Sequence, residues 1–342
     1  MRSIAVINQK GGVGKTTTAV NLAAAFTLAR KSVLLIDLDP QSHASAHVGV
    51  ELQPGEPSLY DVIVHGAPVA EIARSVNDRL AVLPASIDLA GAEVELVGRA
   101  RRETVLRDAL HAYQDQFDFC IVDCAPALGL LTVNALAAVR EVLIPLQPHF
   151  LALQGLGRLL ETVSLVRDEL NPALRVAGVV LCMHERGTKL AQEVVDDVTT
   201  FMASAAPDAP WHGARIFSTP IRRNIKLAEC PSFGKTIFDY AGTSHGAEDY
   251  ANLARELLRD GRPTRSPRTA HGGVAASQNQ SDASIAAPAN IRQAAGEFPA
   301  PAVDGGADND FERRTPPAAD EPREHRGVAP DGAAVAADRA TP

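Results

Sequence analysis

The stretch that decides the fold is Asn8-Gln9-Lys10-Gly11-Gly12-Val13-Gly14-Lys15-Thr16-Thr17. It follows an apolar, strand-like run and leads into a segment with the apolar spacing of a helix. In such a strand–loop–helix context, glycines let successive backbone N–H groups point at phosphate oxygens, and the positive end of the helix adds to the attraction. The sequence therefore predicts a phosphate-binding loop.

The loop carries two lysines with different expected roles. Lys15 is placed to neutralise the β and γ phosphates of a nucleotide, and the Thr16 hydroxyl can bind Mg²⁺. The usual spacing of a phosphate loop would put a glycine at Gln9, and a second lysine, Lys10, follows it. A lysine at the rim is poorly placed for its own nucleotide, but it can reach a phosphate bound by a facing subunit. We expect residues 9–17 to bind nucleotide, with Lys10 and Lys15 as catalytic cations.

Two further apolar strands end in carboxylates. One contains Asp37 and leads into Asp39, and the other ends at Asp123. Ligands sit at the carboxyl ends of the strands in open α/β sheets. We expect Asp39 to orient the attacking water, Asp37 to support Thr16 or the metal shell, and Asp123 to hold Mg²⁺ through water. Each acid alone could instead cap the turn that follows it.

Strand-like runs alternate with helical spacing along most of the chain, which is typical of a doubly wound, mostly parallel α/β sheet. The predicted strands are Ile4–Asn8, Ser32–Asp37, Leu80–Pro84, Asp118–Asp123, Glu141–Leu146 and Arg175–Met183. The predicted helices are about Lys15–Arg30, Arg101–Tyr113, Leu130–Val139, Gly155–Glu169, Thr188–Ala203 and Ala247–Arg259. We expect one P-loop ATPase domain over residues 1–262.

The composition changes near Arg262. The 342-residue chain is 46% hydrophobic and 22% charged, which is ordinary for a globular protein. Residues 263–342, however, are rich in Pro, Ala and Gly and contain no Leu, Lys, Tyr or Trp. Such a segment buries too little apolar surface to offset its conformational entropy. We predict a disordered C-terminal tail, which either is passive or docks a partner.

The charge pattern bears on nucleic-acid binding. The formal net charge is −8, so binding to DNA would require a local basic patch. Residues 215–226 contain Arg215, Arg222, Arg223 and Lys226 with no acidic residue, and Arg186 and Lys189 could join them in the fold. We expect Arg186, Lys189, Arg215, Arg223 and Lys226 to contact DNA phosphates. The alternative is a solvated or ion-paired surface.

The ends and the cysteines bear on location. The apolar run at the amino terminus is too short for a secretion signal, and no run approaches the ~18 apolar residues of a membrane span. The four cysteines form no C-x-x-C pair and lack the paired spacing of a zinc site. We expect a cytoplasmic protein with buried, free thiols and no integral membrane association.

These motifs resemble those of the ParA-type partition ATPases, within the larger group that includes MinD. The resemblance runs from Ile4 to about Leu258. Residues 10–16 match the deviant Walker A motif, residues 37–41 the following acidic motif, and residues 121–123 the Walker B strand. Residues 129–136 and 228–235 also look like family segments. The chain departs from the family at Cys124-Ala125-Pro126-Ala127, where two prolines and a serine are usual.

The resemblance implies an ATP- and Mg²⁺-bound homodimer in which Lys10 contacts the nucleotide of the partner subunit and Asp39 promotes hydrolysis. It also implies non-specific DNA binding, association with the nucleoid, and a ParB-like centromere-binding partner that stimulates hydrolysis. The ATPase is then expected to be weak without that partner. By the same resemblance, the segment Thr219–Asn224 lies near the adenine base, with Pro220 and Arg222 as the residues that contact the nucleotide.

Three other readings stay open at this point. A related ATPase of this group could position a protein cargo in place of DNA. A MinD-type switch would require an amphipathic C-terminal helix, for which residues 263–342 lack leucine. A metal-cluster enzyme would require a cysteine paired with Cys124 across a dimer interface.

Overall fold

The computed structural model describes residues 1–149, 152–185 and 189–259. The predicted domain boundary at residue 262, the predicted tail and Arg186 lie outside the described residues. All the elements of the predicted α/β domain lie within them, apart from the first residue of the helix predicted at 188–203.

Nine strands form one mostly parallel sheet within the described residues. They are β1 (Arg2–Val6), β2 (Val33–Leu38), β3 (Arg74–Asn77), β4 (Leu80–Leu83), β5 (Phe119–Cys124), β6 (Glu141–Leu146), β7 (Arg175–His184), β8 (Arg215–Ile216) and β9 (Ile221–Arg222). The six predicted strands are all present, with ends that differ by no more than two residues. The three that the sequence pattern missed have two to four residues each, which is too short to show a period.

Helices connect these strands. The longer ones are α1 (Lys15–Leu28), α6 (Leu130–Ala138), α7 (Ala152–Glu169), α8 (Lys189–Ala203) and α11 (His245–Arg259). The shorter α-helices are α2 (His43–His47), α3 (Val69–Ile72), α4 (Leu89–Glu95), α5 (Val105–Leu110), α9 (Ile225–Glu229) and α10 (Ile237–Ala241). Single turns of other helix types are η1 (Asp61–His65), η2 (Leu96–Gly98), η3 (Arg102–Thr104), η4 (His111–Tyr113) and η5 (Cys230–Phe233). The helix predicted at 101–113 is therefore divided into three pieces, η3, α5 and η4.

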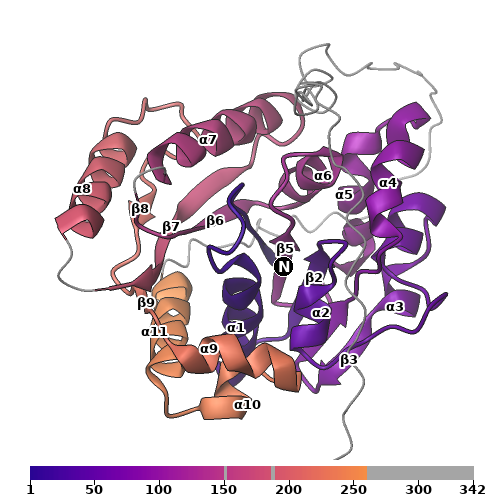
Figure 1. The fold of residues 1–342 in the computed structure, drawn as a ribbon. Helices are drawn as coiled ribbons and strands as arrows, with labels where there is room; N and C mark the ends of the chain where they lie inside the picture. Colours follow the sequence, from indigo (N-terminus) through magenta and orange to yellow (C-terminus); the bar gives the residue numbers. More distant parts are fainter. Residues whose placement is uncertain (150–151, 186–188, 260–342) are drawn as a thin grey trace, which may run out of the picture. The chain divides into compact units, whose positions relative to one another are not determined.

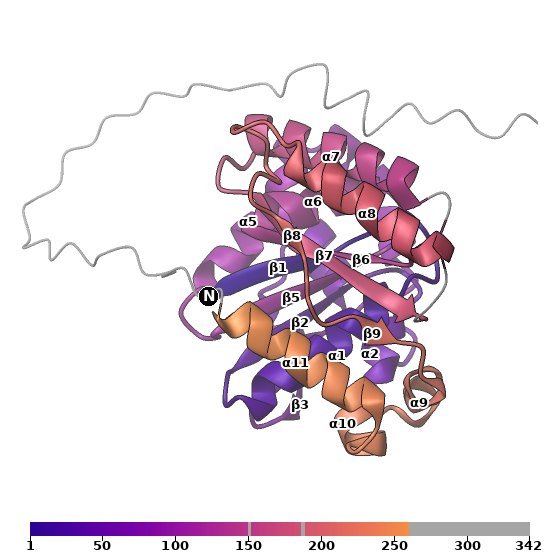
Figure 2. The ribbon, with the colours of Figure 1, turned by 90° about the vertical axis from the view of Figure 1, so that its left-hand side faces the viewer.

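The strand order is β3-β4-β2-β5-β1-β6-β7-β8, with β9 pairing with β7. Only β3 runs antiparallel, at the edge next to β4. Figure 2 shows the strands running side by side, with α6, α7 and α8 above them and α1 and α11 below. Since neighbouring strands are parallel, their carboxyl ends share one edge of the sheet, and Figure 1 looks onto that edge.

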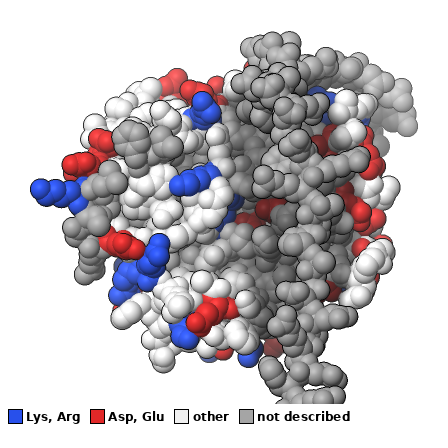
Figure 3. Space-filling model, viewed as in Figure 1, with Lys and Arg blue, Asp and Glu red and all other residues white. Residues whose placement is uncertain are grey.

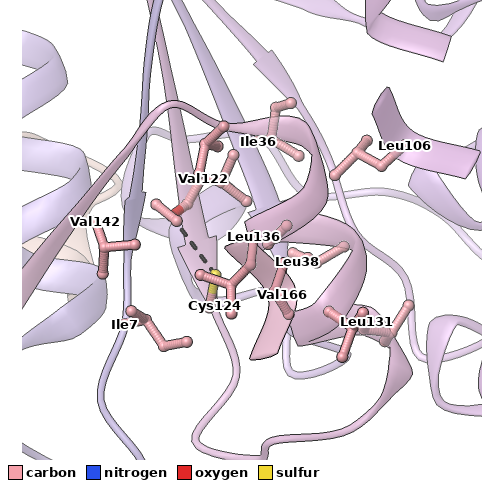
Figure 4. Packing of buried hydrophobic residues seen from close by; sticks show 14 of the residues in the cluster. Ile7, Ile36, Leu38, Leu106, Val122, Cys124, Leu131, Leu136, Val142 and Val166 are labelled. Atoms are coloured by element: carbon pink, nitrogen blue, oxygen red, sulfur yellow. Dashed lines mark hydrogen bonds between the residues drawn. The ribbon is translucent and has the colours of Figure 1, made fainter. Parts of the chain in front are cut away.

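Side chains alternate between the two faces of the sheet and build two hydrophobic cores. On one face Ile36 and Val122 pack with Leu106 of α5, Leu136 of α6 and Val166 of α7 (Figure 4). On the other face the neighbouring positions of the same strands pack against α1, α2 and α11. Asp37 and Asp123 follow Ile36 and Val122, so alternation turns both carboxylates toward the face that α1 covers.

An ion-pair network closes the opposite, amino edge of the sheet. The buried carboxylate of Glu141 accepts hydrogen bonds from Arg2 at 3.0 and 2.7 Å and from Arg175 at 2.7 Å. Arg2 also donates to the carbonyl of Leu257 at 2.5 Å, which ties the end of α11 to β1.

Among the described residues, no helix is long and apolar enough to cross a membrane.

Candidate phosphate and nucleotide site

The predicted phosphate loop connects β1 to α1 as expected. Gly12 has φ +73° and Gly14, the residue before α1, has φ +92°, a region that side-chain-bearing residues rarely occupy. These two glycines turn the chain so that α1 begins at Lys15, and the first helical bond runs from Thr18 N–H to the Gly14 carbonyl at 2.9 Å. The loop thus ends at the positive end of a helix, which is a favourable place for phosphate.

The side chain of Lys15, the first residue of α1, folds back into the phosphate loop. Its side chain is largely buried, and its ammonium donates a hydrogen bond to the Lys10 carbonyl oxygen at 3.1 Å. Burial lowers the pKa of Lys15, while the nearby carboxylates of Asp123 and Asp39 raise it. Lys15 and the two acids therefore share one small site, although they come from three different segments of the chain.

Asp123, at the end of β5, is the most unusual group of the site. The residue is fully buried, and neither carboxylate oxygen has a hydrogen-bond partner among the described residues. Burial raises its pKa well above the usual range, and the charge of Asp37 raises it further. The nearby Thr16 hydroxyl, which lies outside hydrogen-bond geometry, and the charge of Lys15 oppose the rise. A bare buried carboxylate is costly unless a cation or a hydrogen-bond donor reaches it.

A divalent cation fits this arrangement. Mg²⁺ is usually bound through one or two carboxylates, several waters and the phosphates of a nucleotide, so it needs few protein ligands. Asp123 and the neighbouring Thr16 supply a carboxylate and a hydroxyl at the phosphate loop. Among the described residues, no group of three or more His, Cys, Asp or Glu side chains could hold a metal by itself.

Asp37, at the end of β2, is held by hydrogen bonds from the segment that follows it. Its carboxylate accepts hydrogen bonds from the Ser45 N–H at 2.8 Å, the Ser45 hydroxyl at 2.7 Å and the Asp39 N–H at 3.3 Å. Burial still raises its pKa, to about 6. Asp37 therefore anchors α2 to the end of β2, and its charge acts on the neighbouring Asp123.

Asp39 and Lys10 lie at the rim. Asp39 is half-buried and accepts a hydrogen bond from the Gln41 N–H at 3.0 Å. Lys10 is exposed, its N–H donates to the Asn8 side chain at 3.0 Å, and its ammonium contacts Nε2 of His149, just after β6. The charge of Lys10 and desolvation both lower the pKa of His149, with desolvation the larger cause.

A cavity of about 510 Å³ opens beside the phosphate loop. Its lining includes Gly14 and Thr17 from the loop and Met183, Asn224, Leu227 and Tyr250 from later segments. Met183 has φ +51°, a strained conformation of the kind that often accompanies functional sites. The volume and the mostly apolar lining are those of a small-ligand pocket.

The two residues predicted to lie near the base differ in their placement. Arg222 lines the cavity, but its guanidinium pairs with Asp249 and Glu248 of α11, and its backbone N–H also donates to Asp249, at 2.9 Å. Pro220 is not among the described residues that line the cavity. Arg222 therefore joins β9 to α11, and its backbone N–H, Nε and Nη2 donors are engaged within the subunit.

Three of the predicted DNA-binding residues have contacts within the subunit. Arg223 pairs with Glu185 at 2.9 Å and Lys226 with Glu229 at 2.8 Å, while the Arg215 guanidinium lies over the Phe217 ring at 5.3 Å. Lys189 is exposed at the first residue of α8. On the face in Figure 3, several basic side chains lie next to acidic ones. Arg186 lies outside the described residues.

Several residues of the site escaped prediction. Met183, Leu227 and Tyr250 are apolar or aromatic residues in strands and helices, so the sequence distinguishes them in no way from core residues. His149 carries no local motif either. Asn224, in contrast, belongs to the segment that the resemblance places near the base, and its side chain caps α9 by accepting from the Lys226 N–H at 2.8 Å.

Comparisons with known proteins agree with this geometry. A family described as an AAA domain matches residues 1–176. The chain is 43% identical over 268 residues to the chromosome partitioning protein ParA of Myxococcus xanthus, covering 78% of this chain and 91% of that protein. It is 44% identical over 259 residues to the sporulation initiation inhibitor protein Soj of Bacillus subtilis, covering 75% and 98%.

A solved structure extends the comparison to a bound nucleotide. Cobyrinic acid a,c-diamide synthase from Mycobacterium smegmatis, with bound ADP and magnesium, superposes with a TM-score of 0.64 at 35% identity. The match covers 76% of this chain and 94% of that one. The identity to the partitioning proteins is higher and extends over a similar share of the chain.

Proposed function

Because the chain belongs to the ParA-type family of chromosome-partitioning ATPases, we propose that it is a dimerising switch that segregates DNA. In this proposal residues 1–262 form the ATPase domain, two copies enclose ATP, and the dimer binds DNA of any sequence on the nucleoid. A ParB-like centromere-binding protein then stimulates hydrolysis of ATP to ADP and phosphate, which releases the dimer.

The phosphate loop supports the first step. The backbone N–H groups of residues 11–16 lie at the start of α1, and the buried Lys15 ammonium is the fixed cation for the β and γ phosphates. Lys15 now donates to a loop carbonyl, a weaker partner than a phosphate oxygen. The proposal gives residues 9–17 the role of the triphosphate site.

Asp123 and Thr16 support a role for magnesium. The two unsatisfied oxygens of Asp123 face the loop beside Thr16, and Asp123 holds its ion through a water molecule in this proposal. When bound, Mg²⁺ neutralises charge on the β and γ phosphates during transfer. Asp37 supports this site indirectly, because it positions the segment that carries Asp39.

The cavity beside the loop supports base binding. It begins at Gly14 and Thr17, so a nucleotide with its phosphates on the loop can extend its sugar and base into it. Leu227 and Met183 offer apolar contact to a flat ring, and Asn224 offers a polar side chain. Arg222 forms one wall, held in place by Asp249.

Lys10 and Asp39 supply the chemical step. Asp39 lies close enough to Lys15 to raise its pKa, so its carboxylate can orient a water molecule near the γ-phosphate. Lys10 contacts His149 of its own subunit, on the outer rim of the loop. In the dimer it exchanges that neutral partner for the phosphates of the facing subunit, where its charge stabilises the transition state.

One observation carries the proposal: a buried carboxylate that has no partner in the described part of the chain stands beside a buried lysine at the end of a phosphate loop. The test is DNA co-sedimentation with ATP, with ADP and with a Lys10→Ala variant. We expect the wild type to bind DNA with ATP and not with ADP. We expect Lys10→Ala to bind nucleotide yet fail to dimerise or hold DNA. Equal DNA binding in all three conditions would contradict a nucleotide-driven switch.

A further inference from the structure

Helix α4 and the turn η2 that follows it are apolar on two opposite sides. Leu89, Ala92 and Leu96 are buried in the core on one side. The other side exposes four apolar residues, Ile87, Ala90, Val94 and Val97. They are spaced by three, four and three residues and so lie along one side of a helix, and we call this surface the stripe. The exposed fractions of Ile87, Val94 and Val97 are 67%, 75% and 64%.

This stripe differs from the scattered apolar residues that any protein surface shows. The described residues expose seven large apolar side chains, and three of the seven lie on it. A helix with apolar residues on both sides is normally covered on both sides. Clustered exposed apolar residues mark a surface that binds another protein.

The stripe adjoins the phosphate site. It begins just after Ala85, whose carbonyl accepts from the Ser42 hydroxyl at 3.0 Å, and Ser42 lies in the loop that follows Asp39. Glu93, on the same helix, accepts from the Leu131 N–H at 3.1 Å, at the start of α6 and after the loop from Asp123. Hence α4 is attached to both acidic loops, at the carboxyl edge that faces the viewer in Figure 1.

Gly129 allows the close contact between Glu93 of α4 and the start of α6. A Cβ placed on Gly129 would lie 2.2 Å from Oε1 of Glu93, so only glycine lets the carboxylate reach the amino end of α6. The position of α4 relative to the site is therefore set by direct contacts. The stripe is the outward surface of an element that frames the nucleotide.

We propose that a second copy of this chain covers the stripe in the ATP-bound dimer, an inference that rests on the proposed function. Lys10 can reach a phosphate of the facing subunit only if two carboxyl edges meet, and the stripe lies on that edge. Stable interfaces bury ~1,200–2,000 Å² and are most apolar at their centre. The polar rim of a phosphate loop cannot supply such a centre, whereas the stripe can.

The charges around the stripe also fit a second copy. The exposed side chains of Asp88 and Glu95 flank it, and those of Arg99 and Arg101 follow its end. Glu95 accepts from the Tyr60 hydroxyl at 2.8 Å and Arg101 pairs with Asp108 at 3.1 Å, but these contacts are exposed and an opposing charge can replace them. In the proposed dimer the two-fold axis runs across this segment, which sets the two copies antiparallel, so the acidic part of one copy opposes the basic part of the other. The surface is therefore complementary to itself, which a strongly acidic or strongly basic partner would not match.

The first experiment places a charge on the stripe in the full-length chain. Val94→Glu and Val97→Glu change exposed side chains and should leave folding intact. Leu28→Glu is the matched control, because Leu28 is 65% exposed at the end of α1, on the opposite edge of the sheet. Dimerisation is measured by sedimentation velocity with Mg²⁺ and a non-hydrolysable ATP analogue, and nucleotide binding is measured separately.

We expect both stripe variants to bind the analogue like the wild type but to need about tenfold more protein to dimerise, as for a buried interface residue. Leu28→Glu should dimerise normally. Wild-type dimerisation by both stripe variants would overturn the proposal.

The second experiment measures burial directly. The four native cysteines are all buried, so Val94→Cys can be labelled selectively with a polarity-sensitive dye. We expect a blue shift on adding the analogue and no shift when Lys10→Ala is also present. A dimer with an unshifted dye would overturn the stripe contact and leave the proposed switch standing. A dye whose emission is already blue-shifted without nucleotide would overturn the proposal and indicate that residues 263–342 of the same chain cover the stripe. A wild-type chain that stays monomeric with the analogue would contradict both the stripe contact and the proposed switch.

Discussion

Asp37 and Asp123 are register partners on the adjacent strands β2 and β5, and both carboxylates are fully buried. They have opposite environments. Asp37 accepts hydrogen bonds from Ser45 and from the Asp39 N–H, whereas Asp123 has no partner among the described residues. One member of the pair thus holds the loop together, and the other is left for a ligand.

This pairing raises the free energy of the protein without ligand. Burial and the charge of Asp37 both raise the pKa of Asp123, which means that its ionised form is disfavoured. Ionising Asp123 without a nearby cation costs free energy, and binding of Mg²⁺ and nucleotide removes this penalty. Strongly perturbed pKa values of this kind cluster at functional sites.

Replacing Asp123 with Asn should therefore stabilise the free protein and weaken the function. We expect the melting temperature without ligand to rise by roughly 2 °C or more, because an amide has no ionised form for burial and the neighbouring Asp37 to penalise. The additional stabilisation that Mg²⁺ gives in the presence of ATP should disappear. Thermal melts with and without Mg²⁺·ATP measure both effects. A variant with unchanged Mg²⁺ dependence would remove Asp123 from the metal site.

Lys15→Ala should weaken nucleotide binding by roughly 100-fold or more, because the phosphates lose a charge-assisted partner inside a largely buried site. Titration with a fluorescent ATP analogue measures the loss. Lys31→Ala is a matched control, since Lys31 lies beyond the far end of α1. Equal affinity in the Lys15 variant and the wild type would reject the assigned role.

Asp39→Ala should keep ATP binding while lowering hydrolysis by roughly 100-fold or more, since only the orientation of water is removed. We expect the ATP-bound dimer to accumulate and to stay on DNA. Phosphate release and sedimentation velocity with ATP measure the two consequences. Turnover at the wild-type rate would exclude Asp39 as the residue that orients water.

Arg223→Ala should reduce DNA retention and lower the slope of its salt dependence by about 1, as expected for one lost phosphate contact. The Arg223–Glu185 pair is exposed on both sides, so it is weak and DNA phosphate can replace it. Glu185→Gln should therefore retain DNA at least as well as the wild type. Arg79→Ala, in the exposed β3–β4 turn at the other end of the sheet, is the control. Loss of binding in the control alone would place the DNA surface elsewhere.

His47 should make stability depend on pH. Burial lowers its pKa from 6.5 to about 4, and its Nε2 lies 3.4 Å from the Cys230 sulfur. The unfolded chain takes up a proton below about pH 6.5 and the folded chain only below about 4. Folding therefore loses up to about 3 kcal/mol as the pH falls through that window.

Asp37 acts in the opposite direction between its ordinary pKa of 3.8 and about 6, because the folded state there binds the extra proton. The comparison is therefore between the wild type and His47→Gln, which share Asp37. Denaturant unfolding at several pH values should show that stability falls more steeply with acid in the wild type. Parallel curves would mean that His47 does not titrate in this window.

Part of the site was predictable because its information is local. The glycines at 12 and 14, the lysine at 15 and the threonine at 16 occupy one turn, so the order of residues largely specifies their relative positions. The ends of β2 and β5 were predictable for a similar reason. Parallel strands bring their carboxyl ends to one edge, which places Asp39 and Asp123 near the loop.

The sequence alone thus determined the fold class, the phosphate loop and the acids around it. Only the tertiary structure decided that Ser45 satisfies Asp37 and leaves Asp123 bare, and that Glu185 and Asp249 engage Arg223 and Arg222. The reason is physical. A backbone turn depends on neighbours in the chain, whereas the partner of a charged side chain depends on which distant segments packing brings within about 3 Å.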